Sequence, residues 1–245
     1  DVLNANFGAS PWVSGVVMMV LTGFVLLGGV KRIGAVAEKL VPFMCIGYVV
    51  VALVVLGLYV DQIPAAFGLI FHHAFNPTAA TGGFVGAGVM MAMRYGVARG
   101  IFSNEAGLGT AGIAQAAGRT RHAAESGLIG MMGTFIDTLI VCTMTGLVLI
   151  VTGVWHSGLK GAVLTSSAFE TALPGFGSNF LALAIVIFAF TTILGWAYYG
   201  EKCWEYLIGT KSEKPYRLLW TAFVLVGAVT HLDFVWLVSD TQNAF

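Results

Sequence analysis

The sequence predicts an all-α polytopic membrane protein, a fold class indicated by its composition and by the lengths of its apolar runs. Of the 245 residues, 58% are apolar and only 10% are charged, whereas soluble domains carry about 25% charged residues. The apolar residues form runs of about 20, the length that an α-helix needs to cross the hydrocarbon core. Basic and acidic residues balance at twelve each, so the composition excludes a nucleic-acid-binding or polybasic membrane-surface protein.

Two membrane-spanning helices are expected at the start of the chain. The first covers about 12–30 and follows Ser10-Pro11, because proline is favoured at the first helical position. The second covers about 40–60, with Pro42 in its first turn, where no intrahelical donor is lost. Residues 65–75 form an amphipathic stretch too short to span, which we expect at the membrane surface.

The third span, at about 82–118, is expected to be discontinuous. It runs into the stretch Arg99-Gly-Ile-Phe-Ser-Asn-Glu-Ala-Gly-Leu-Gly-Thr110. Irregular polar backbone survives at membrane depth only where it is buried in protein or lines a wet cavity. We therefore expect a broken helix beside a path, with the break within 102–109 or, alternatively, at Gly82-Gly83.

The remaining spans are expected at 126–154, 179–199, 216–231 and, as the start of a seventh, 234–245, with a loop at 156–177. If the first span runs from outside to inside, eleven of the twelve basic residues fall on inner segments, as the positive-inside rule requires. The chain opens without a signal-peptide pattern and stops inside a predicted helix. We therefore expect one partial transmembrane domain over 1–245.

Residues 102–110 hold groups that can bind a small charged ligand. Gly107 and Gly109 permit backbone angles that expose carbonyl and amide groups. Thr110 is expected to cap the following helix, whose N-terminal amides favour a carboxylate. An amino-acid zwitterion fits such a site. The spacing of these residues alone is equally consistent with a glycine-rich turn where a helix ends on the cytoplasmic side. Oxygens that suit Na⁺ or an ammonium group come from Ser103, Asn104 and Glu105.

The run Gly96-Val-Ala-Arg-Gly-Ile-Phe-Ser-Asn-Glu-Ala-Gly-Leu-Gly109 resembles the signature of the alanine or glycine:cation symporter family, with Thr110 in place of the usual serine. The resemblance implies a LeuT-type inverted-repeat transporter of the amino acid-polyamine-organocation superfamily. The seven spans would then be core helices 4 to the start of 10. Other stretches that resemble the family, in order, are 26–33, 38–44, 135–138, 188–201 and Asp240-Thr241.

The resemblance also implies a function and a site. We expect a sodium-coupled secondary active symporter, and no enzyme, that imports alanine or glycine by alternating access in a bacterial or archaeal plasma membrane. No covalently bound cofactor is expected, and N-terminal helices that precede Asp1 would complete the site. The expected substrate contacts are Phe102, Ser103, Asn104, Glu105, Ala106, Gly107, Thr192 and Trp196, and the expected Na⁺ ligands are Thr191 and Thr192.

The fifth span is expected to supply the wall that faces the broken helix. Phe188, Thr192, Trp196 and Tyr199 recur at spacings of three and four, so they share one helix face. Read without the resemblance, the same pattern indicates threonine hydroxyls bonded to the preceding helical turn and an interfacial aromatic belt.

Asp137 lies in the middle of the fourth span, where an acid is costly and should face protein or water. We favour a strut, hydrogen-bonded to Thr134, Thr138 or a neighbouring helix, over a proton or cation relay. A proton-coupled carrier, with Asp137 or Glu105 titrating, is the nearest alternative function. An ion channel fits less well, because filters usually come from rings of identical subunits.

Overall fold

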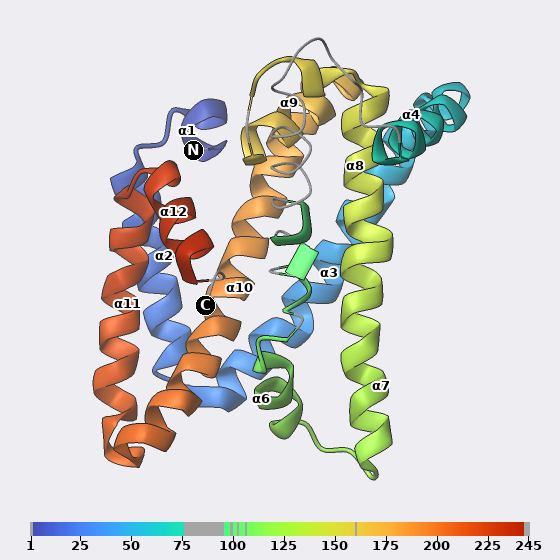
Figure 1. The fold of residues 1–245 in the computed structure, drawn as a ribbon. Coiled ribbons are helices and arrows are strands. Elements are labelled where there is room, and N and C mark those ends of the chain that lie inside the picture. The colour runs from blue at the N-terminus through green and yellow to red at the C-terminus, as the bar shows by residue number, and fades with distance from the viewer. Residues whose placement is uncertain are drawn as a thin grey trace. The chain divides into compact units, whose positions relative to one another are not determined.

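The computed structural model describes residues 2–75, 96–98, 100–101, 103–105, 107–159 and 161–242. The secondary structure of these residues is helical (Figure 1), which confirms the all-α prediction for this part of the chain. Three described helical stretches are long and apolar enough to cross a membrane: Gly29–Leu58, Ala123–Val151 and Gly177–Ile208. The chain divides into two compact units, Asp1–Val51 with His156–Phe245 (unit 1) and Ala52–Trp155 (unit 2).

Unit 1 is built around α2, α10 and α11, which pack on one another (Figure 1). Two glycines of α2 bring it close to α11. A Cβ on Gly15 would lie 2.8 Å from Ala228 Cβ, and one on Gly23 would lie 3.1 Å from Thr221 Cγ2. Small residues at such crossings let membrane helices approach closely. The elements of this unit are α1 (Val2–Phe7), α2 (Pro11–Leu26), most of α3 (Gly29–Leu58), α9 (Gly161–Ala172), α10 (Gly177–Ile208), η4 (Thr210–Ser212), α11 (Glu213–Val229) and α12 (Leu232–Gln242).

The core of unit 1 lies where the turn between α2 and α3 meets the middle of α10. Leu26 and Leu194 are each only 1% exposed, and Val25, Ile33 and Ala197 join them in one cluster. On α10, Leu194 and Ala197 are three residues apart and so share a helix face. That face packs the helix onto its own unit.

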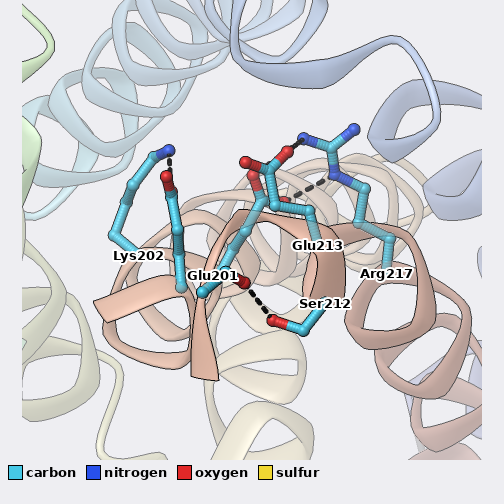
Figure 2. A network of polar contacts seen from close by, with 7 residues as sticks. Glu201, Lys202, Ser212, Glu213 and Arg217 are labelled. Carbon is cyan, nitrogen blue, oxygen red and sulfur yellow. Dashed lines mark hydrogen bonds and ion pairs between the residues drawn. The ribbon is translucent and has the colours of Figure 1, made fainter. Parts of the chain in front are cut away.

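A polar network fastens the C-terminal part of α10 to α11 (Figure 2). The guanidinium of Arg217 on α11 donates to the carboxylate of Glu201 on α10 through Nε at 2.6 Å and Nη2 at 2.7 Å. Arg217 also lies 3.4 Å from Glu213. The Glu201 side chain is only 3% exposed, so this two-pronged pair is shielded from water. By contrast, the pair of Lys202 with Glu205 is partly exposed.

The turn between α9 and α10 is closed by one carboxylate. Glu170 accepts hydrogen bonds from the backbone N–H of Gly175 at 2.6 Å and from both the N–H and the hydroxyl of Ser178, at 3.0 and 2.6 Å. A Cβ on Gly177 would lie 2.0 Å from the carbonyl oxygen of Phe169, so only glycine fits there. These contacts order α9 inside a stretch that the sequence predicts as a loop.

Unit 2 contains a long helix whose middle part is π-helical. Helix α7, the π-helical stretch η2 and α8 run without a gap over Ala123–Val151, and α8 packs against α4. The elements are the end of α3, η1 (Val60–Gln62), α4 (Ile63–Phe75), α6 (Thr110–Ala116), α7 (Ala123–Thr134), η2 (Phe135–Cys142) and α8 (Thr143–Val151).

Two helices extend well beyond the apolar runs that predict them. Helix α3 begins at Gly29 rather than near residue 40, and α10 continues to Ile208 rather than ending near 199. Hydropathy marks where the bilayer crosses a helix, whereas charged residues continue the helix outside it. The stretch 76–95, which holds the alternative break at Gly82-Gly83 and the first part of the third span, lies outside the described residues.

Candidate functional site

Residues 103–110, called here the polar segment, contain the interruption of the helix. Ser103 and Asn104 still have helical backbone, but Glu105 has a φ of 54°, and Gly107 and Gly109 have φ of 80° and 78°. Left-handed backbone at three positions in five residues ends the regular hydrogen bonding. A Cβ on either glycine would meet nothing within 4 Å, so both are required for their backbone angles. Glu105 adopts the same region at a conformational cost.

A side-chain hydrogen bond closes the polar segment on itself. The hydroxyl of Thr110 donates to Glu105 Oε2 at 2.5 Å, and the N–H of Leu108 donates to the carbonyl of Glu105 at 3.3 Å. Thr110 is the first residue of α6, and Gly109 occupies the N-cap without a side-chain cap. The expectation that Thr110 caps α6 is therefore wrong, because its hydroxyl is already bonded to Glu105.

The polar segment is bonded across to η2, in the middle of the helix Ala123–Val151. The hydroxyl of Ser103 donates to Asp137 Oδ2 at 2.5 Å. The hydroxyl of Thr138 donates to Asn104 Oδ1. Asp137 thus accepts a hydrogen bond from a neighbouring segment, as the strut interpretation expects, and its role stays a prediction. Two consecutive polar residues on one segment contact two on the other.

The role of Thr138 is missed by sequence reasoning, which names it only as a possible partner of Asp137. A signal was present, because Asp137-Thr138 interrupts an apolar run and Ser103-Asn104-Glu105 is a polar stretch. Buried polar groups need partners in a membrane, so pairing these two stretches is the simplest way to satisfy both. The π-helical backbone on which both residues lie, Phe135–Cys142, carries no sequence signal that we recognise.

The second part of the expected site lies on α10, in unit 1. Thr192 is exposed, and Trp196 is half-buried with its ring centroid 5.8 Å from that of Tyr199. At 3.6 residues per turn, Thr192 and Trp196 each point about 200° from Leu194. They therefore face away from the core of unit 1.

Thr191 behaves differently from its neighbour. Its hydroxyl lies 3.1 Å from the carbonyl oxygen of Ile187 and 3.0 Å from that of Phe188, on the preceding turn of α10. This is the intrahelical bonding that the sequence alone favours. The Thr191 oxygen keeps lone pairs for a cation, but its proton is used. Its assignment as a Na⁺ ligand stays a prediction.

The structure groups the expected site residues into two sets. The polar segment set comprises Ser103, Asn104, Glu105 and Gly107 in unit 2, while Thr191, Thr192 and Trp196 lie on α10 in unit 1. Phe102 and Ala106 lie outside the described residues. That the two sets line one site stays a prediction.

The chain matches the sodium:alanine symporter family over residues 1–245. It is 49% identical to an uncharacterized transporter of Haemophilus influenzae over 97% of this chain and 53% of that protein. It is 46% identical to the sodium/alanine symporter AgcS of Methanococcus maripaludis over 99% of this chain and 53% of that protein. Identity to a putative sodium/proton-dependent alanine carrier, YrbD of Bacillus subtilis, is 37% over 96% of this chain and 51% of that protein.

The chain therefore spans about half the length of these curated relatives. The match to the family nevertheless covers all 245 residues, including the polar segment and the α10 residues described above. These relatives come from bacteria and an archaeon and carry the names of transporters. The chain belongs to the sodium:alanine symporter family.

Proposed function

We propose that the complete protein is a sodium-coupled symporter that imports a small neutral amino acid, alanine or glycine, by alternating access across a bacterial or archaeal plasma membrane. The observation that carries the proposal is the interruption of the helix at Glu105, Gly107 and Gly109. Broken helices with exposed backbone are where secondary transporters hold their substrate and coupling ion.

The site is proposed to combine the polar segment with the exposed face of α10. Backbone groups at the break and the polar side chains of Ser103 and Asn104 bind the charged ends of the amino acid. Thr192 contributes its hydroxyl to Na⁺, with Thr191 as a second oxygen, and Trp196 limits the space for the substrate side chain. Helices of the inverted-repeat fold that precede this chain would complete the shell.

The names of two relatives support the coupling. AgcS is a sodium/alanine symporter, and YrbD is a putative sodium/proton-dependent alanine carrier. The second name keeps proton coupling as the alternative, in which Glu105 or Asp137 would carry the proton. Na⁺ is the coupling ion we favour, because sodium stands in both names.

Uptake of radiolabelled alanine by the complete protein in proteoliposomes tests the proposal. An inward Na⁺ gradient should drive accumulation, whereas Li⁺ or a proton gradient alone should not. Accumulation driven equally by a proton gradient without Na⁺ would overturn the coupling assignment. Saturation of flux with alanine separates a carrier from a channel.

At the residue level, Thr192→Val should raise the Na⁺ concentration needed for half-maximal uptake. The replacement has the same shape and removes only the hydroxyl. The matched control is Thr221→Val on α11, whose hydroxyl bonds within its own helix at 2.7 Å and should leave the Na⁺ dependence unchanged. Equal Na⁺ dependence of the two variants would remove Thr192 from the ion site.

A further inference from the structure

The hydrogen bonds from η2 determine which groups the polar segment can offer to a ligand. A serine hydroxyl has a single proton, and that of Ser103 is donated to Asp137. Ser103 therefore presents lone pairs. An asparagine side chain has one carbonyl oxygen and two amide protons. Since Thr138 donates to the oxygen of Asn104, Asn104 presents its amide protons, which no described residue accepts.

The two residues that contact the polar segment are adjacent in the π-helical stretch η2, Phe135–Cys142. Asp137 contacts Ser103, and Thr138 contacts Asn104. Two neighbouring side chains of one helix thus hold two neighbouring side chains of the polar segment.

We propose that Asp137 and Thr138 are positioning residues that fix the donor and acceptor polarity of the substrate site. Asp137 holds Ser103 as an acceptor for the ammonium group of the amino acid. Thr138 holds Asn104 as a donor to its carboxylate. This inference rests on the proposed function, since it takes the ligand to be a zwitterionic amino acid.

If Ser103 offered its proton and Asn104 its oxygen, both groups would repel the ends of the amino acid. Without the Thr138 hydroxyl, the Asn104 carboxamide is free to rotate and to turn its oxygen towards the substrate carboxylate, where two acceptors repel. Without the Asp137 carboxylate, the Ser103 proton is free to point at the ammonium group, which has only donors to offer. Each change removes a charge-assisted hydrogen bond, which corresponds to a loss of about tenfold in affinity.

Competition experiments with alanine and with alaninamide distinguish the binding of the carboxylate from the binding of the ammonium group. Both compounds carry the ammonium group, but alaninamide lacks the carboxylate. The complete protein is reconstituted, and inhibition constants of the two compounds against uptake of radiolabelled alanine are measured. Thr138→Val should raise the inhibition constant of alanine about tenfold and leave that of alaninamide unchanged. Ser103→Ala and Asp137→Ala should raise the inhibition constants of both compounds by a similar factor.

Two further variants control the measurement. Thr138→Ser keeps the hydroxyl and should restore the wild-type constants. Thr152→Val removes a hydroxyl that bonds to the carbonyl of Val148 on the same long helix, at 2.7 Å, and should change neither constant. A general loss of packing would affect both compounds alike and would not be rescued selectively by serine.

Two results overturn the inference. The first is a Thr138→Val variant that weakens the binding of alanine and of alaninamide equally, or weakens neither. The second is a Ser103→Ala variant that weakens the binding of alanine alone. This second test remains decisive even if Thr138→Val does not fold. Wild-type proteoliposomes that take up no alanine would instead refute the proposed function. The two failures are therefore distinguishable.

Discussion

Arg217→Gln tests how α10 and α11 are held together. The variant removes two short hydrogen bonds to Glu201, from Nε at 2.6 Å and Nη2 at 2.7 Å, and leaves a carboxylate that is only 3% exposed without its partner. Breaking a buried ion pair by removing one partner costs about 3–5 kcal/mol. Glu213 cannot compensate, because it carries the same charge as Glu201.

The exposed pair on the same helix provides the matched control. Lys202 Nζ lies 2.5 Å from Glu205 Oε2, but the two side chains are 37% and 25% exposed, and exposed pairs contribute about 0–1 kcal/mol. Lys202→Gln should therefore have little effect. The double variant Glu201→Gln with Arg217→Gln should recover most of the stability lost in Arg217→Gln, because no buried charge remains unpaired.

Thermal unfolding of the purified complete protein in detergent measures these differences, with tryptophan fluorescence as the signal. One kcal/mol shifts Tm by about 2–4 °C in domains of about 150–250 residues, and by less in a protein about twice as long, so Arg217→Gln should lower Tm by roughly 5 °C. Lys202→Gln should change Tm by less than about 2 °C. Equal shifts for Arg217→Gln and Lys202→Gln, or a double variant as unstable as Arg217→Gln, would refute the reasoning.

Two further predictions concern the same unit. Gly200→Ala places a Cβ 2.0 Å from the hydroxyl oxygen of Tyr216, so it should lower the free energy of unfolding by about 1–3 kcal/mol, measured by thermal unfolding. In the control Gly195→Ala the new Cβ meets nothing within 4 Å, so this variant should be neutral or stabilising. Equal effects of the two variants would contradict the packing of α10 on α11. Hydrogen bonds from the Ser178 hydroxyl first, and from backbone N–H groups next, hold the pKa of Glu170 below its ordinary value of 4.5. A lowered folded-state pKa stabilises the protein above the ordinary value, and this stabilisation is lost as pH falls through the lowered pKa. Glu170→Gln should therefore flatten the decline of Tm below about pH 5, and an unchanged decline would contradict this role.

Three described helical stretches are long and apolar enough to cross a membrane, and such stretches are predictable because each needs about 20 apolar residues and little else. Of the two breaks that the sequence allows, the one at Gly82-Gly83 lies outside the described residues. The one within 102–109 coincides with the left-handed residues Glu105, Gly107 and Gly109. Glycine is informative there because few other residues adopt positive φ at low cost. Helix ends are less predictable, as α3 and α10 show. Charged residues can continue a helix beyond its apolar run, and the apolar run is all that hydropathy detects.

The contacts of the polar segment could be predicted only in part. The polar residues at 103–105 and at 137–138 indicate that both stretches need partners, but they do not say which side chain bonds to which. The π-helical backbone of Phe135–Cys142 leaves no composition signal. The same holds for Thr110, whose position suggests a helix cap but whose hydroxyl bonds to Glu105. Helix α9 is hidden for a related reason, because tertiary contacts through Glu170 order a stretch with loop-like composition.

Protection of single cysteines by substrate tests most directly whether the polar segment and α10 line one site. Ser103→Cys, Thr192→Cys and the control Thr221→Cys are made in the complete protein with its own cysteines replaced by serine. The rate of modification by a thiol reagent is measured with Na⁺, with and without alanine. Alanine should slow modification at positions 103 and 192 and leave position 221 unchanged. Unchanged rates at position 103 or 192 would contradict a shared site.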